Sequence, residues 1–360
     1  MGIVNWLLEP IREVRDLAPA EVQTATRSLR LTGAQTIKDG TFESLEQQRL
    51  AAKQHRSRVL VLGIPSALML GLLVYLLNLW METDSTDSVL WGVIAAVVGG
   101  LLVHLIADVG FWLFRKTAKH SVLSALAVQQ GLQYQMESVP GDIMDAFEGQ
   151  NLFGSSTNGG KSEDLFMGKI SDVDFMLFEA ERESISRSKE STTTKLIFHG
   201  LCMRLSFPKR FSGTTRVMSD KGMLNKLHTT GNDLPLERVK LEDAAFEKQF
   251  EVLSTDQVEA RYLLTPALME RLVEVQKILG PKTRLRAGFF DRHMLLTLDT
   301  RKNRPLSKRV GVSLNKLHHF EIPDVSKPVE ESGLTKQFDK EIAVCRAIVD
   351  TLKLNMKTRV

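Results

Sequence analysis

Residues 155–162 come closest to a motif with a known chemistry. The run Ser-Ser-Thr-Asn-Gly-Gly-Lys-Ser nearly matches the phosphate-binding loop G-x-x-x-x-G-K-[ST], but Ser155 stands where the first glycine belongs. Such a loop needs a buried strand before it and a helix after it, so that backbone amides point at the phosphate. Here no such strand precedes the motif, and a strand-like run, Leu165–Ile170, follows it. The sequence therefore favours a surface loop over a nucleotide site, and we expect no cofactor.

The histidines and cysteines show no spacing typical of a metal site. His199 and Cys202 lie three residues apart on an apolar run, but nothing supplies a third catalytic member or an oxyanion site. His199 is better explained as a hydrogen-bonded core or bulge residue. Cys202 and Cys345 are the two cysteines, which excludes a disulfide framework or a zinc motif. Three glutamates alternate along one predicted strand, a pattern more typical of a solvated face than of acid–base catalysis: Glu179, Glu181 and Glu183. We predict no catalytic or metal-binding residue.

Two ionisable residues lie inside a long apolar run. His104 and Asp108 are four residues apart and therefore share one face of a helix. An ionisable pair at membrane depth suggests a proton or ion path. Both lie near the end of the run, however, where polar side chains reach lipid headgroups or one another. Two helices also form no pore without oligomerisation, so the pair stays a candidate intramembrane polar pair.

Basic residues gather in the second half of the chain. The net charge of the whole chain is +4. A mildly basic domain fits a position beside anionic lipid. Aromatic residues that could stack on bases are sparse, so we expect no nucleic acid partner. A plain solvated surface is the alternative. The candidate membrane-facing residues are Lys209, Arg210, Arg284, Arg286, Arg301 and Lys302.

The elements that position these residues start from a pair of predicted membrane-spanning helices. Val59–Leu79 carries no charge, and at 1.5 Å per residue its 21 residues span about 31 Å, enough for a bilayer core. Val89–Phe114 forms a second span after the acidic turn Met81–Ser88. Lysines and arginines flank the outer ends and none lies in the turn, which predicts an inner-membrane protein with both termini in the cytoplasm. Small residues recur every fourth position and predict two facing stripes: Gly63, Ala67 and Gly71 against Gly92, Ala96 and Gly100.

The remainder predicts an α+β fold, a cytoplasmic antiparallel sheet with flanking helices. We expect a loop over Gln150–Asp164, a basic loop over Pro208–Asn232, and a strand over Phe246–Ser254. Leu285–Phe290 and His293–Leu298 predict a hairpin that turns at Asp291-Arg292. The predicted divisions are an N-terminal helical segment 1–58, the hairpin 59–114, the α+β domain 115–326 and a C-terminal helix 327–360.

Several segments resemble an uncharacterised bacterial membrane family, domain of unknown function 3137. They are the paired spans, the runs DLFMGKISDVDFMLFEAE and IAVCRAIVDTLKLN, and above all FEVLSTDQVEARYLLTPALMERL at Phe250–Leu272. The resemblance extends over about Gln48–Leu354. It implies two spans and a cytoplasmic α+β domain, and it transfers no activity or catalytic residue.

These observations predict a membrane-anchored cytoplasmic binding or scaffold module. The expected partners are the lipid bilayer, through its anionic headgroups, and a protein partner or a second copy of the chain. Two alternatives stay open at this point. One is a membrane-tethered enzyme whose active site forms only in the fold, and the other is a subunit of an oligomeric channel or transporter.

Overall fold

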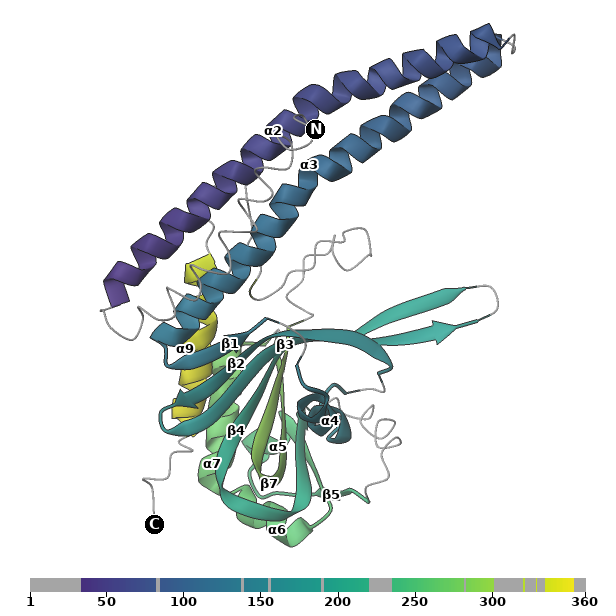
Figure 1. Ribbon diagram of the computed structural model, residues 1–360. Helices are drawn as coiled ribbons and strands as arrows, with labels where there is room; N and C mark the ends of the chain where they lie inside the picture. Colours follow the sequence, from purple (N-terminus) through teal and green to yellow (C-terminus); the bar gives the residue numbers. More distant parts are fainter. Residues whose placement is uncertain are drawn as a thin grey trace. The chain divides into compact units, whose positions relative to one another are not determined.

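The computed structural model divides the chain into two units, Met1–Ala125 with Ile322–Thr335, and Leu126–Glu321 with Lys336–Val360 (Figure 1). For residues 34–42, 85 and 334–337 only the backbone is described. Residues 1–33 of the predicted segment 1–58 lie outside the described residues. The structure describes residues 34–81, 85–136, 139–154, 157–188, 191–219, 235–281, 283–300, 320, 328 and 334–352.

Two long helices make up the described part of the first unit. Helix α2 (Ala34–Trp80) has 47 residues and α3 (Ser85–Gln129) has 45, so each is roughly 70 Å long. Both are long and apolar enough to cross a membrane. Large apolar side chains are exposed along both helices from Val61 to Trp112, a surface that suits lipid far better than water. The helices also continue well beyond the length that a bilayer requires.

The small residues lie in the seam between the two helices. A Cβ added at Gly71 would lie 2.7 Å from the Ala96 Cβ, and one added at Gly99 would lie 3.1 Å from the Ala67 Cβ. Nothing lies within 4 Å of such an atom at Gly100. The stripes therefore face each other as expected, but Gly99 is the contact residue and the assignment of Gly100 was wrong.

The seam continues past the predicted spans through a buried histidine. His55 is 1% exposed, and its Nε2 lies 3.2 Å from the Ile106 carbonyl oxygen of α3. Gly110 makes room for the ring, because a Cβ there would lie 3.1 Å from the His55 Cδ2. Leu45, Ala52 and Val59 are buried at spacings of seven residues along α2, as in a coiled coil.

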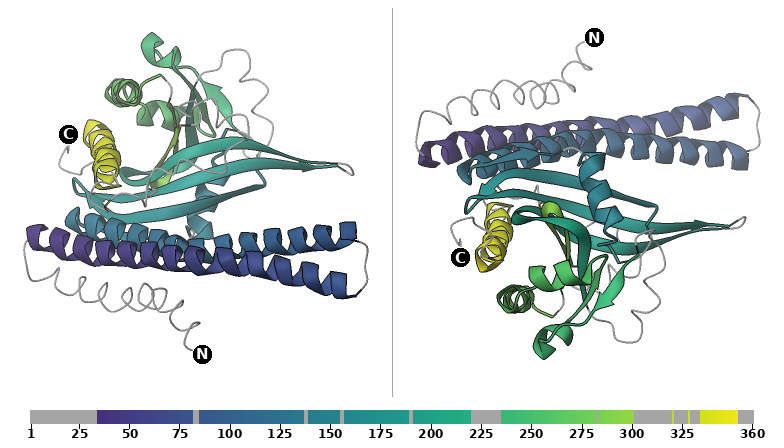
Figure 2. Two further views of the ribbon diagram at one scale, coloured as in Figure 1. Left: turned by 90° about the horizontal axis from the view of Figure 1, so that it is seen from above. Right: turned by 90° about the horizontal axis from the view of Figure 1, so that it is seen from below.

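The second unit is built on a seven-stranded antiparallel sheet, which confirms the α+β class. Its path runs β1-β2-β3-β4-β6-β5, and β7 pairs with β4. The paired ends of β3 and β4 extend beyond the other strands (Figure 2). The strands are β1 (Leu132–Gln135), β2 (Gly159–Ile170), β3 (Val173–Arg187), β4 (Thr192–Ser219), β5 (Glu237–Val239), β6 (Phe250–Ser254) and β7 (Arg284–Asp299).

Strand β7 is one bent strand, so the hairpin predicted at Asp291-Arg292 was wrong. Both halves of β7 pair with β4, and the register shifts twice between Ser206 and Thr215. Arg286 and Asp299 are 13 residues apart, a span of about 43 Å in a straight strand, yet their side chains lie 3.7 Å apart. The two strands therefore fold back together, and Asp291 takes a positive φ of 49° at the bend. We call the tip of this bend, residues 208–213 and 291–292, the corner; most of it is exposed, but Phe211 is buried.

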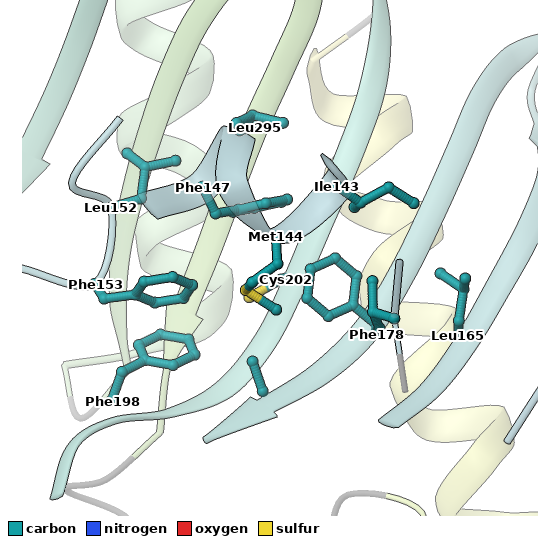
Figure 3. Packing of buried hydrophobic residues seen from close by; sticks show 12 residues of the cluster. Ile143, Met144, Phe147, Leu152, Phe153, Leu165, Phe178, Phe198, Cys202 and Leu295 are labelled. Carbon is teal, nitrogen blue, oxygen red and sulfur yellow. The ribbon is translucent and has the colours of Figure 1, made fainter. Parts of the chain in front are cut away.

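Helix α4 (Gly141–Gly149) supplies the core of the bent sheet (Figure 3). Its apolar side chains, including Phe147, pack against Phe178, Phe198 and Leu295 from three strands. Arg216 donates to the Gly149 carbonyl at 2.9 Å, so a buried cation meets the carbonyl end of the helix. Burial lowers the pKa of Arg216 to about 10.

The other helices are α5 (Ala244–Glu247), α6 (Gln257–Leu263), α7 (Pro266–Leu279) and α9 (Leu334–Leu352). The strand predicted over Phe246–Ser254 is therefore partly helix, because the Asp243 carboxylate accepts from the Ala245 and Phe246 amides and starts α5. The two predicted loops were too long: β2 begins at Gly159, and β4 continues to Ser219.

Candidate functional site

The phosphate-loop-like motif forms no phosphate site in the described residues. Gly159–Ser162 belongs to β2, so a strand and not a helix N-terminus follows the glycines. The Lys161 ammonium lies 2.8 Å from the Glu163 carboxylate, which neutralises it locally. The described part of the motif therefore lacks the loop-to-helix geometry of a phosphate-binding loop, while Ser155 and Ser156 lie outside the described residues.

A polar cluster lies on one face of the sheet, across β2, β3 and β4. The register places Glu163 opposite Glu179, and Glu181 opposite His199. The His199 Nε2 and the Glu179 Oε1 are 3.4 Å apart, and both side chains are 4% exposed. The expectation of a solvated glutamate face was therefore wrong for Glu179 and Glu181, which are both buried.

A bulge in β2 adds a further carboxylate, that of Asp164, to this cluster. The β2–β3 register shifts between Glu163 and Phe166, and Asp164 takes a positive φ of 59° there. Its side chain is fully buried, and the Tyr134 hydroxyl donates to Oδ1 at 2.7 Å. Burial and then the Asp164 charge raise the pKa of Tyr134 well above its usual range. Tyr134 therefore serves as a proton donor in the hydrogen bond at any ordinary pH.

The cluster has donors that could hold a divalent cation. Carboxylate oxygens of Glu163, Asp164 and Glu179 all lie within 4.8 Å of one another. Oxygen ligands of this kind suit Mg²⁺, Ca²⁺ or Mn²⁺. Sequence reasoning missed this grouping because its members come from two strands and a bulge. The only local signal was the alternation of Glu179 and Glu181, which also fits an exposed strand.

The candidate pairing of His199 with Cys202 is contradicted by the sheet geometry. Residues three apart on a regular strand point to opposite faces, and Cys202 packs in the hydrophobic core with Phe198 and Phe178. Burial raises the pKa of the Cys202 thiol well above its usual value. A thiolate nucleophile is therefore strongly disfavoured at this position.

Residues 196–354 match the family model described as Protein of unknown function (DUF3137). The match covers somewhat less than half of the chain, so the similarity to this family holds for this segment. The segment begins within β4 and includes His199, whereas Glu163, Asp164 and Glu179 precede it. The description of the family assigns no activity, so the match supports the resemblance noted above and leaves the chemistry open.

Two other comparisons add nothing to the argument. A search of curated proteins found no match. The mycobacterial trehalose monomycolate transport factor A, TtfA, is similar to the chain at 10% sequence identity, with a TM-score of 0.32. That comparison covers 67% of this chain and 97% of the TtfA chain. A likeness at this TM-score carries no argument about the DUF3137 segment or its function.

The predicted basic residues do not form a single surface. Lys209 and Arg210 are exposed at the corner, and the Arg210 Nε lies 2.9 Å from the Asp291 carboxylate. Arg286 is 2% exposed and donates to the Leu152 carbonyl, so its assignment to a membrane-facing surface was wrong. Arg284 is half-buried, while Arg301 and Lys302 lie outside the described residues.

The intramembrane candidates His104 and Asp108 form part of a three-residue contact. The His104 Nδ1 lies 3.5 Å from the Asp108 carboxylate, and the Arg56 Nε of α2 lies 3.2 Å from it. Arg56 also lies over the Phe111 ring. Sequence reasoning missed Arg56 because its partner is 52 positions away on the other helix. The contact joins α2 to α3, which gives Asp108 a packing role that needs no ion path.

Proposed function

We propose that this chain is a membrane-anchored binding module. In this proposal α2 and α3 span the inner membrane as a hairpin, and both termini and the sheet domain lie in the cytoplasm. The observation that carries the proposal is the belt of exposed large apolar side chains on both helices, between the Lys- and Arg-rich outer flanks. A folded domain attached to such an anchor is held at high effective concentration near any membrane-bound partner.

The proposed partner is a membrane protein or an anionic headgroup surface. The sheet domain supports this proposal, because its surface exposes both cations and large apolar side chains. Hydrogen bonds hold the elements that carry these side chains in place. A second copy of the chain is a further candidate partner. The division of the chain at residues 58, 114 and 326 belongs to the same proposal.

A membrane-tethered enzyme is the second candidate, because the buried carboxylate and histidine cluster favours it. Glu163, Asp164, Glu179 and His199 could act on a substrate or hold a cation that does. A channel role for His104 and Asp108 has less support, because Arg56 already pairs with Asp108.

Fractionation and crosslinking of the full chain in its native membrane test the proposal. The protein should resist extraction by alkaline carbonate, and a reporter fused after Val360 should lie in the cytoplasm. A photocrosslinker at exposed Tyr262 should capture a membrane component, whereas one at buried Leu263 should not. An external C-terminal reporter or a freely extractable protein would refute the anchor.

A further inference from the structure

Helix α6 exposes the two most solvent-accessible large apolar side chains among the described residues of the sheet unit. Val258 is 62% exposed and Tyr262 is 73% exposed. They are four residues apart and therefore neighbours on one face of the helix, while Ala260 and Leu263 anchor the opposite face. The Asp256 carboxylate accepts from the first amides of α6, so the short helix is firmly started.

The corner of the bent sheet lies directly beside this helix. The Glu259 carboxylate accepts from the Ser212 amide at 2.8 Å and from the Gly213 amide at 2.7 Å. These bonds fix α6 to the bend of β4, and Figure 1 shows the two side by side. Because Glu259 and Tyr262 are three residues apart, Tyr262 lies on the flank of α6 that is next to the corner.

Cations and carboxylates both lie around the apolar pair, and three of the cations are left without an ion pair in the described structure. Lys209, Arg261 and Arg292 are exposed, and none has an ion-pair partner within the described part of the chain. Four carboxylates on the neighbouring elements are already engaged: Asp291 pairs with Arg210, Glu259 accepts the two corner amides, Asp256 accepts from the first amides of α6, and Glu237 accepts from the Gln257 side chain. The result is an exposed apolar pair bordered by cations, which we call the α6 patch: Lys209, Val258, Arg261, Tyr262 and Arg292.

We infer that the α6 patch binds the surface of an anionic bilayer, with Val258 and Tyr262 entering the headgroup region. Tyrosine suits this boundary because its ring is apolar and its hydroxyl remains hydrated. Exposed cations on α6 and at the corner complement the negative charge of the headgroups. The inference rests on the proposed function, since the anchor supplies the high local concentration that so small a patch needs. A protein partner of the same patch is the competing outcome of the test.

The test uses the full chain in nanodiscs, where both membrane faces are accessible. Cys202 and Cys345 are buried, so an environment-sensitive dye can be placed selectively by Val258→Cys. Ile278→Cys on α7 is the matched control, because Ile278 is also apolar and exposed but lies on a different helix. The readouts are the emission shift of the dye and its quenching by spin-labelled lipid.

We expect a blue shift and quenching at position 258 in discs that contain phosphatidylglycerol, and neither in phosphatidylcholine alone or at position 278. Each cation near an anionic surface contributes about fivefold to partition, so Lys209→Gln with Arg292→Gln should weaken the contact about 25-fold. Tyr262→Ser should reduce quenching while the salt dependence persists.

Equal quenching in both lipids, or no effect of the double neutralisation, would overturn the assignment to anionic lipid. A signal at position 258 that appears only in native membranes, and not in protein-free lipid, would show that the patch binds a protein. Failure of the chain to enter nanodiscs would instead count against the membrane anchor. The two hypotheses therefore fail in different ways.

Discussion

The hairpin seam allows a sharp test with two glycines on neighbouring helices. We predict that Gly71→Leu destabilises the packing of α2 against α3 and that Gly100→Leu does not. A Cβ at position 71 would lie 2.7 Å from both the Ala96 Cβ and the Gly92 carbonyl oxygen, whereas position 100 opens onto empty space. The two substitutions add the same side chain, so they differ only in where it points.

The expected magnitude follows from the contact distances. Nonbonded carbons prefer separations of about 3.5–4.0 Å, so the added Cβ at position 71 is roughly 1 Å too close. Moving the helices apart by that distance forfeits about a quarter to a half of each contact across the seam. Overpacking of this kind costs about 1–3 kcal/mol. At position 100 the gain in helix propensity makes the change neutral or slightly stabilising, by at most ~1 kcal/mol.

Reversible SDS titration of the purified full chain measures the difference through the tryptophans of the hairpin, Trp80, Trp91 and Trp112. Gly71→Ala provides a graded control and should fall between the wild type and Gly71→Leu. Equal destabilisation at positions 71 and 100, or greater destabilisation at 100, would refute the assigned seam.

Three further predictions concern the sheet domain. Arg216→Met should lower the free energy of unfolding by about 1–3 kcal/mol, because the Gly149 carbonyl loses a hydrogen bond from a charged donor. Thermal denaturation against the exposed control Arg238→Met measures this, and equal losses would contradict the capping role. Cys202 and Cys345 should resist alkylation at pH 8 until the protein unfolds, since burial raises both thiol pKa values; rapid labelling of the native protein would contradict their burial. In the folded protein the pKa values of both thiols lie above the ordinary value of 9.0. The contribution of the protonated thiols to the free energy of unfolding is therefore fully present below pH 9 and declines above it. The decline for the pair is up to ~2.7 kcal/mol per pH unit. Replacing both by Ala should remove that part of the alkaline slope.

The hairpin could be predicted from the sequence because its signals are local. Span length, apolar character and flanking charge can each be seen within one stretch of chain. The error at Gly100 has a simple geometric origin. With 100° per residue, a residue eight positions after Gly92 is rotated 80° away from it, whereas Gly99 is rotated only 20° away. A strict four-residue repeat therefore leaves the seam after two steps.

The bend of β7 could not be predicted from local sequence. Two apolar runs on either side of Asp291-Arg292 are typical of a two-residue hairpin. The halves pair with β4 instead, whose residues lie some 80 positions upstream, and local patterning does not specify that partner. The same limit applies to the polar cluster, because Glu163, Asp164 and His199 meet only once three strands are in register.

The burial of that cluster bears on the choice between an enzyme and a binding module. A substrate must reach the reacting groups, yet Glu179 and His199 are 4% exposed and Asp164 is fully buried. Catalysis there would require the parts of the chain that cover this face of the sheet to move aside by local opening. The α6 patch needs no such opening, because Val258 and Tyr262 already face solvent on a helix fixed by the Glu259 carboxylate. Substitution separates the two cases. If Glu179→Gln lowers the free energy of unfolding but leaves the cellular role of the refolded protein intact, the cluster is structural; if it removes that role without loss of stability, the enzyme hypothesis gains support.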